Sequence, residues 1–367
     1  MTIHLKSLRL SALVGAVALT SALAACGASE TPTASSPTAT TGASSAAAGA
    51  TIDVGSGKIT PKNIDKIAYM VQAGKTFSYT AAQAQGAQDA AKELGVTVDV
   101  YYSNLDPTVE LSNFNQIFPT DKYGGLLIQS VNQQLCKTIG DTSVKESMLV
   151  LVVGNPLCDQ ATAVGEALWS PGTIGYMGGQ NGVDGITGLL NDSAKLVTGP
   201  QKVMLAMGIK GHPSVVAWEA AFKEFQTTHP DWTLANETFT DFTTPGAFAA
   251  VQNSLQGNPD VTIIYSLYVD VTAGVVKAVA AQNLTDKIKV FENGGGSKVS
   301  VQLLTEGKEV GSLPVYPYSL GFEGVKSMVA ALKGTQPPKF VPGDGNPDAG
   351  TQGTITKENV ASFKPQW

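Results

Sequence analysis

The chain is almost without arginine. Among its 367 residues the only arginine is Arg9, close to the start. Arginine is the side chain that most often clamps carboxylates and phosphates, because its planar guanidinium donates two parallel hydrogen bonds. A binding site built from the rest of the chain has no such clamp, which disfavours an anionic ligand. Lysine can still pair with an anion, so the argument is a bias and not an exclusion.

Histidine and cysteine are also scarce, with three of each. His212 and His229 are the only histidines beyond the first ten residues, and each precedes a proline in an expected loop. They do not assemble into a metal cluster or a catalytic triad. We therefore predict a non-enzyme with no catalytic residue, no metal and no cofactor. The net charge of −6 argues against nucleic acid as a partner.

Residues 1–25 have the pattern of a secretory signal. Lys6 and Arg9 precede an apolar run that ends in Leu23-Ala24-Ala25-Cys26. A positive start and a short apolar core before small residues are typical of exported proteins. The segment resembles the lipobox of bacterial lipoproteins, which implies lipidation of Cys26 and an extracytoplasmic protein that is lipid-anchored to the bacterial cell membrane. An ordinary cleaved signal with an incidental cysteine is the alternative.

A low-complexity segment follows Cys26. Residues 27–50 are almost entirely Ala, Ser, Thr, Gly and Pro, a composition that cannot bury enough apolar surface to fold. We expect a disordered linker over 26–63. Outside the cytoplasm the two remaining cysteines, Cys136 and Cys158, suggest one disulfide, with two buried free thiols as the alternative.

From residue 64 onward, short apolar runs alternate with helix-length segments. The first series predicts strands over 66–71, 96–101, 125–128, 148–153 and 174–177, with helices over 78–94, 107–118 and 134–146. The second predicts strands over 202–207, 233–239, 261–265, 288–291 and 312–316, with helices over 183–197, 214–227, 246–256, 270–282 and 318–333. Such alternation is typical of parallel sheets with right-handed crossovers. We predict an α/β protein with two doubly wound parallel-sheet lobes and a ligand cleft at the carboxyl ends of the strands.

Several motifs, in this order, resemble the periplasmic binding proteins of the ribose/galactose type, which are solute receptors of ATP-driven importers. They are Gly86–Gly95, Leu126–Asn132, Gly178–Asn181, Ala220–Phe222 and Phe291–Gly294. The resemblance spans about 64–340 and implies a type I fold whose hinge crosses between lobes three times, near 178, 315 and 345. It places 64–178 plus 316–345 in the N-terminal lobe, and 179–315 plus 346–367 in the C-terminal lobe.

The resemblance also implies the residues that face the ligand: Phe77, Tyr79, Asn155, Gln180, Asn181, Trp218, Tyr268, Asp270, Asn293 and Tyr316. At several of these positions the family has charged clamps where this chain has amides and aromatics. Amides both donate and accept hydrogen bonds, and aromatic rings offer flat apolar faces. Together these side chains suit a neutral ligand.

The resemblance therefore implies a monomeric solute-binding protein that delivers a small neutral ligand to the permease of an ABC importer by cleft closure. A monosaccharide or polyol is the expected ligand. A neutral aromatic or nucleoside-like ligand is the alternative, because Trp218, Tyr268 and Tyr316 are aromatic. A sensor that presents its ligand to a signalling partner is a further alternative.

Overall fold

The computed structural model describes residues 50–367 except 132, 134 and 350–352. The predicted signal, Cys26 and the linker up to residue 49 lie outside the described residues. The described residues all belong to one compact unit. Within them, every helix is too short or too polar to span a bilayer.

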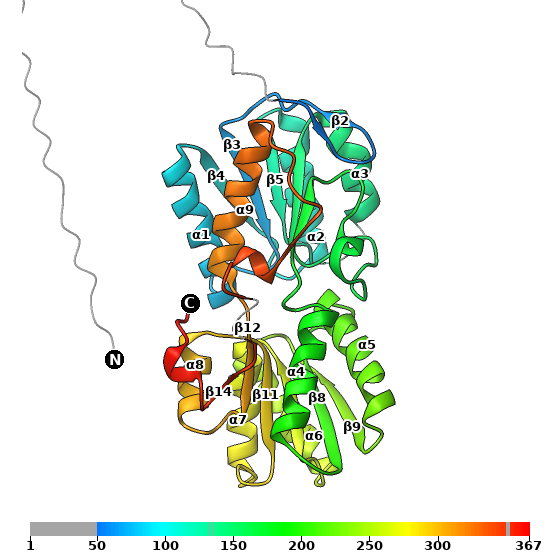
Figure 1. Ribbon diagram of the computed structural model, residues 1–367, viewed down its shortest axis with the longest axis vertical. Helices are drawn as coiled ribbons and strands as arrows, with labels where there is room; N and C mark the ends of the chain where they lie inside the picture. Colours follow the sequence, from blue (N-terminus) through cyan, green and yellow to red (C-terminus); the bar gives the residue numbers. More distant parts are fainter. Residues whose placement is uncertain (1–49, 132, 134, 350–352) are drawn as a thin grey trace, which may run out of the picture. The chain divides into compact units, whose positions relative to one another are not determined.

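The first of two six-stranded sheets organises the N-lobe (Figure 1). Its strand order is β13-β7-β6-β5-β3-β4, and all neighbouring strands are parallel. The strands are β3 (Lys66–Val71), β4 (Thr97–Tyr102), β5 (Gly125–Ile128), β6 (Leu149–Gly154), β7 (Gly175–Gly178) and β13 (Phe340–Pro342). Its helices are α1 (Ser78–Leu94), α2 (Pro107–Ile117), α3 (Leu135–Glu146) and α9 (Pro317–Leu332). Helices α1 and α9 pack against each other. Separate apolar clusters on the two faces of the sheet enclose its strands.

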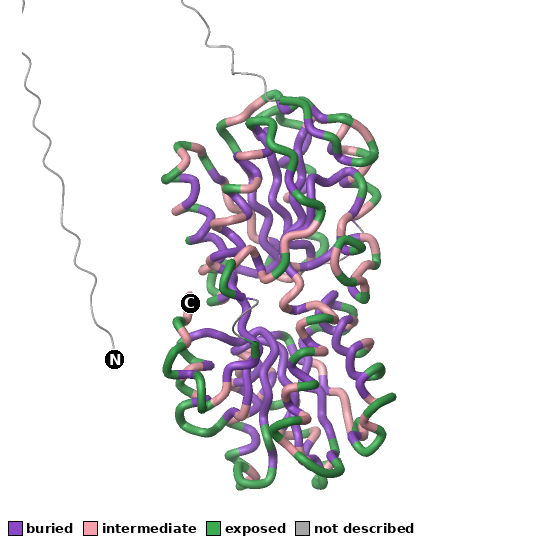
Figure 2. Tube along the Cα trace, viewed as in Figure 1, coloured by how far each residue is buried: buried purple, intermediate pink, exposed green. Residues whose placement is uncertain are grey.

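The second sheet organises the C-lobe, with the order β14-β12-β11-β10-β8-β9. All pairs are parallel except β12 with β14 at the edge. The strands are β8 (Gln201–Met207), β9 (Trp232–Phe239), β10 (Ile263–Leu267), β11 (Lys289–Gly295), β12 (Gly311–Pro314) and β14 (Ile355–Thr356). The helices are α4 (Val183–Leu196), α5 (Pro213–Thr228), α6 (Thr244–Gly257), α7 (Val269–Ala281) and α8 (Lys298–Thr305). The strands of both sheets are mostly buried, whereas exposed residues gather on helices and loop tips (Figure 2).

The predicted fold class, an α/β protein with two parallel-sheet lobes, is confirmed by this topology. Local sequence signals explain why most predicted bounds lie within two residues of the observed ones. Helix α2, for example, begins at Pro107 after Asp106, whose carboxylate accepts a hydrogen bond of 2.7 Å from the Thr108 backbone N–H. The elements that the sequence patterns do not predict include α8, β13, β14 and the short 3₁₀ turns η1 (Phe118–Thr120), η2 (Gly165–Leu168), η3 (Gly343–Gly345) and η4 (Val360–Ser362).

The prediction of a linker up to residue 63 is wrong for its last part. Strands β1 (Ile52–Asp53) and β2 (Lys58–Ile59) pair in an antiparallel ribbon. The side chains of Ile52, Val54 and Ile59 are almost fully buried in the N-lobe core. Because burying three branched apolar side chains is strongly favourable, this segment belongs to the fold. The low-complexity argument applied only to residues 27–50.

The chain passes between the two sheets at three places within residues 50–367: between β7 and α4, between β12 and α9, and between β13 and β14. Asp344 in η3 ties these crossings together. Its carboxylate accepts a hydrogen bond of 3.1 Å from the Tyr316 backbone N–H in the second crossing, and another from the Gln180 backbone N–H in the first. Burial raises the pKa of Asp344 to about 6.

The structure also joins Cys136 and Cys158 by a disulfide. Their Cα atoms lie 5.0 Å apart, within the usual range for a disulfide. Cys136 lies in the first turn of α3 and Cys158 follows β6. The bridge therefore links the start of α3 to the loop after β6 at the carboxyl end of the N-lobe sheet.

Candidate functional site

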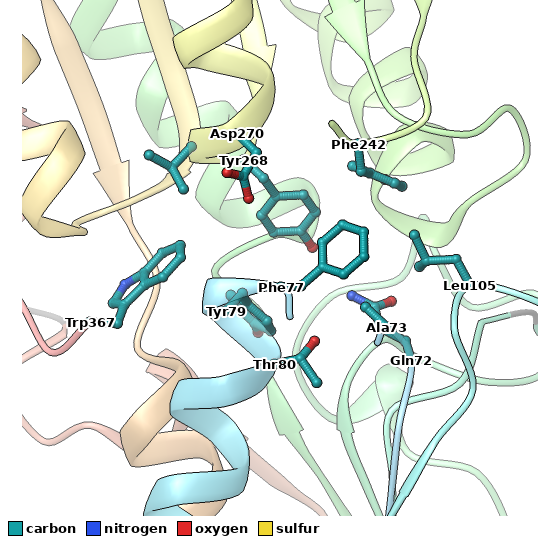
Figure 3. Close-up of a pocket in the computed structure, with 11 residues that line it drawn as sticks. Gln72, Ala73, Phe77, Tyr79, Thr80, Leu105, Phe242, Tyr268, Asp270 and Trp367 are labelled. Carbon is teal, nitrogen blue, oxygen red and sulfur yellow. The ribbon is translucent and has the colours of Figure 1, made fainter. Parts of the chain in front are cut away.

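A pocket lies between the N-lobe and the C-lobe, where the strands of both sheets end (Figure 3). Gln72 directly follows β3 on the N-lobe side, and Tyr268 directly follows β10 on the C-lobe side. Parallel α/β sheets bind ligands at this end of their strands. The pocket is lined by Gln72, Ala73, Phe77, Tyr79, Thr80, Leu105, Phe242, Tyr268, Val269, Asp270 and Trp367.

The walls of the pocket are mainly aromatic. The Tyr79 ring, at the start of α1, lies 5.6 Å from the Tyr268 ring and 5.7 Å from the Trp367 ring, measured between centroids. The Phe242 ring lies 5.5 Å from the Tyr268 ring. Phe77 projects toward the middle of this group (Figure 3). Five aromatic side chains thus surround one space, and they can enclose a ring-shaped ligand.

Tyr268 has a strained backbone. Its φ of 69° and ψ of 151° lie in a region that residues other than glycine rarely adopt. Gly294 makes room for it, because a Cβ atom at position 294 would come within 2.4 Å of the Tyr268 ring. Strain of this kind concentrates at functional sites, where the surrounding structure holds a side chain in a required place.

Behind the aromatic walls, a buried polar cluster joins the two lobes. The Gln72 Oε1 atom accepts hydrogen bonds from Asn155 Nδ2 at 2.6 Å and from His212 Nε2 at 2.9 Å. His212, which precedes α5, accepts a hydrogen bond of 3.3 Å from the Ser214 backbone N–H at Nδ1. Its proton therefore sits on Nε2, which makes Nε2 the donor to Gln72. Burial lowers the pKa of His212 to about 4, so the imidazole is neutral at pH 7.

A second polar contact lies nearby and joins the first crossing to the C-lobe. Asn181 Nδ2 donates a hydrogen bond of 3.1 Å to the Tyr268 hydroxyl. Three buried oxygen atoms around the pocket, Thr80 Oγ1, Asn155 Oδ1 and Asn181 Oδ1, have no hydrogen-bond partner among the described residues. Buried polar atoms are normally paired, so these three are available to a ligand or to water.

The lining carries little charge. Asp270 in α7 is its only charged residue, and burial raises the pKa of this carboxyl group. No lysine belongs to the set of lining residues. The pocket therefore offers aromatic faces, amides, hydroxyls and one carboxylate, which can accept hydrogen bonds from hydroxyl groups.

The predicted site residues fall into four groups. Phe77, Tyr79, Tyr268 and Asp270 line the pocket. Asn155 lies behind it in the polar cluster that joins the lobes, and Asn181 lies in the first crossing, where it bonds Tyr268. Gln180 and Tyr316 belong to the crossings, where Gln180 Nε2 donates a hydrogen bond of 3.1 Å to the Pro314 carbonyl oxygen.

The fourth group, Trp218 and Asn293, lies in the C-lobe core instead of on the pocket wall. Both side chains are 0% exposed. Trp218 Nε1 donates a hydrogen bond of 3.1 Å to Asn293 Oδ1, and the Trp218 ring packs 5.1 Å from the Tyr265 ring. The two polar groups satisfy each other, because a buried indole N–H needs an acceptor.

Several residues of this region are absent from the predicted set, among them Gln72, His212, Phe242 and Trp367. Gln72 and Phe242 follow strands β3 and β9 closely, so their places at strand ends could have indicated them. His212 was interpreted only as a loop residue, since its partner Gln72 is distant in sequence. For Trp367 the sequence carries no signal, because the strand pattern ends well before it.

Comparisons with known proteins agree with this geometry. The profile of the periplasmic binding protein domain matches residues 67–336. The ribose import binding protein RbsB of Haemophilus influenzae is 25% identical over 260 residues, which cover 71% of this chain and 83% of that protein.

Solved structures are similar in fold. The Caulobacter myo-inositol binding protein bound to myo-inositol has a TM-score of 0.69 at 17% identity, over 82% of this chain and 96% of that one. A carbohydrate transporter solute-binding protein from Agrobacterium radiobacter, in complex with D-arabinose, has a TM-score of 0.68 at 19% identity, over 81% and 98%. Identities this low support a shared fold and not a shared ligand.

Proposed function

Because the chain belongs to the periplasmic binding protein family, we propose that it delivers a small neutral ligand, a monosaccharide or polyol, to an ABC importer. Its role is binding and not catalysis. The observation that carries the choice of ligand is the composition of the pocket between the lobes, with five aromatic side chains and no lysine or arginine among its lining residues. Sugar rings present apolar faces to aromatic side chains and hydroxyl groups to amides and carboxylates.

The two lobes enclose the ligand by a hinge motion about the three crossings. We place one moving body at 64–178 plus 316–345, together with the ribbon of β1 and β2, and the other at 179–315 plus 346–367. The direct contact between Gln72 and His212 joins the two bodies and is a polar contact of the closed form. A permease that recognises only this arrangement of the lobes would distinguish the loaded receptor from the empty one.

A neutral ligand that is larger and flatter than a sugar is the second candidate, in which the aromatic walls dominate recognition. The five aromatic side chains are the specific observation in favour of that second candidate, a nucleoside-like or aromatic neutral ligand. A sensor for a signalling partner would use the same pocket, and its ligand would be the same.

We further propose that the protein is exported, lipidated at Cys26 and held at the outer face of the cell membrane as a monomer. The apolar run before Cys26 and the low-complexity linker support this location. An oxidising compartment is also where the bridge between Cys136 and Cys158 would persist.

A thermal-shift screen of residues 50–367 tests the proposed function. We expect one neutral monosaccharide or polyol to raise the melting temperature, with a stabilisation that grows as RT ln(1 + [L]/Kd) and reaches about 2.7 kcal/mol at 100 times Kd. Nucleosides and aromatic alcohols form the second panel, and a response confined to them would select the second candidate. A response confined to sugar acids and sugar phosphates would refute the neutral ligand.

A further inference from the structure

We propose that Phe363–Trp367, here called the strap, is a fourth tie between the lobes and that Trp367 is a specificity-determining residue of the pocket. The strap follows η4 in the C-lobe and contacts both lobes. The part of the proposal that concerns specificity rests on the proposed function, whereas the tie between the lobes does not.

The strap is anchored to the C-lobe at both of its ends. Phe363 packs against a small apolar cluster of Leu304, Ile355 and Val360. At the other end, the Lys298 backbone N–H, at the start of α8, donates a hydrogen bond of 2.9 Å to the Trp367 carbonyl oxygen. The strap therefore has a defined position on the C-lobe.

From that position Gln366 reaches the N-lobe. Its Oε1 atom accepts a hydrogen bond of 3.2 Å from the Ser319 backbone N–H, and its Nε2 atom donates one of 2.8 Å to Ser319 Oγ. Ser319 lies in the first turn of α9, where backbone N–H groups have no partner inside the helix. Gln366 thus caps an N-lobe helix from the C-lobe side.

Trp367 completes the contact. Its ring meets the Tyr79 ring edge to face and forms the side of the pocket opposite Phe242 and Leu105 (Figure 3). Tyr79 belongs to α1, so this contact also crosses between the lobes. Because an indole is the largest side chain, its position limits how far a ligand can extend on that side. Removing it would enlarge the pocket and expose Tyr79.

Spin-label distance measurements on the full-length chain test the tie without any ligand. Labels on cysteines at the exposed positions Glu93 and Lys223, in a Cys26→Ser background, report the separation of the lobes. Gln366→Ala and Trp367→Ala are each expected to shift the distance distribution toward longer values. Lys364→Ala is the matched control, since it changes an exposed side chain in the same segment. Distributions of Gln366→Ala and Trp367→Ala that coincide with that of the control would overturn the tie.

Titration of the same variants with D-ribose and with myo-inositol tests specificity. For whichever compound binds the wild type, Trp367→Ala is expected to weaken binding by about tenfold, while Trp367→Phe retains most of it. Equal affinity of Trp367→Ala and the Lys364→Ala control would overturn the role of Trp367. If neither compound binds the wild type, the proposed ligand class fails for these two probes. The distance measurement needs no ligand, so it still tests whether the strap ties the lobes together.

Discussion

The two lobes contribute to the site in different ways. The N-lobe presents Phe77 and Tyr79 from the loop and first turn that follow β3, so that their rings border the pocket. At the corresponding depth of the C-lobe, Trp218 and Asn293 bond to each other and are fully buried. A position that the family resemblance implies for the pocket wall can therefore lie in the core, because a large side chain with a buried partner is packed there.

The largest effect is expected at the buried C-lobe position. Trp218→Ala should lower the free energy of unfolding by about 3–5 kcal/mol, because it leaves a cavity and removes the hydrogen-bond donor to Asn293 Oδ1. Urea denaturation measures the loss. A variant of near wild-type stability that no longer binds the ligand would place Trp218 on the pocket wall instead and remove the contrast between the lobes.

Loss of the disulfide should destabilise one lobe more than the other, since Cys136 and Cys158 both lie in the N-lobe. Replacing both by serine is expected to cost roughly 3 kcal/mol in the chain-entropy account of cross-links. Hydrogen exchange should then show weaker protection in β5 and β6 than in β10 and β11. Equal losses of protection in both sheets, or no loss at all, would contradict a bridge that stabilises the N-lobe alone.

The free energy of unfolding should also depend on pH through His212, which lies in the contact between the lobes. Its pKa is about 4 in the folded protein against an ordinary value of 6.5, so its neutral form is favoured on folding. The resulting stability is complete above pH 6.5 and is lost as pH falls toward 4, by up to about 3 kcal/mol. Asp344 acts in the opposite direction, because its pKa is raised to about 6 and its effect weakens folding as pH rises from 4 to 6.

Comparison of the wild type with His212→Asn separates the effect of His212 on the pH dependence of stability from the effect of Asp344. The difference in their free energies of unfolding should change by about 2 kcal/mol in favour of the variant between pH 7 and pH 4.5. His229→Asn, outside the contacts between the lobes, is the matched control. A difference that stays constant across this range would show that the His212 imidazole is not buried between the lobes.

The smallest effect on stability is expected at the N-lobe wall. Phe77 is partly exposed, so Phe77→Ala should lower the free energy of unfolding by less than about 1 kcal/mol. Binding of the ligand should nevertheless weaken, because the ring projects into the pocket. Thermal melting with and without the ligand separates the two effects. Unchanged ligand stabilisation would remove Phe77 from the site.

Much of the fold follows from local sequence patterns, whereas the site follows only in part. Buried parallel strands such as β6 are continuous apolar runs, and helices such as α2 carry their own caps. The ribbon of β1 and β2 was missed because its strands are two residues long and gain stability only from the core beneath them. Trp367 could not be predicted for a similar reason, since its place depends on contacts with residues far away in sequence.

Titration calorimetry of residues 50–367 tests the central claim most directly. The compounds are D-ribose, D-arabinose and myo-inositol, together with a sugar acid and a sugar phosphate of matched size. The account predicts saturable binding of at least one neutral compound at one site per chain, and no binding of the two anions. Binding of an anion in the absence of binding by any neutral compound would contradict it.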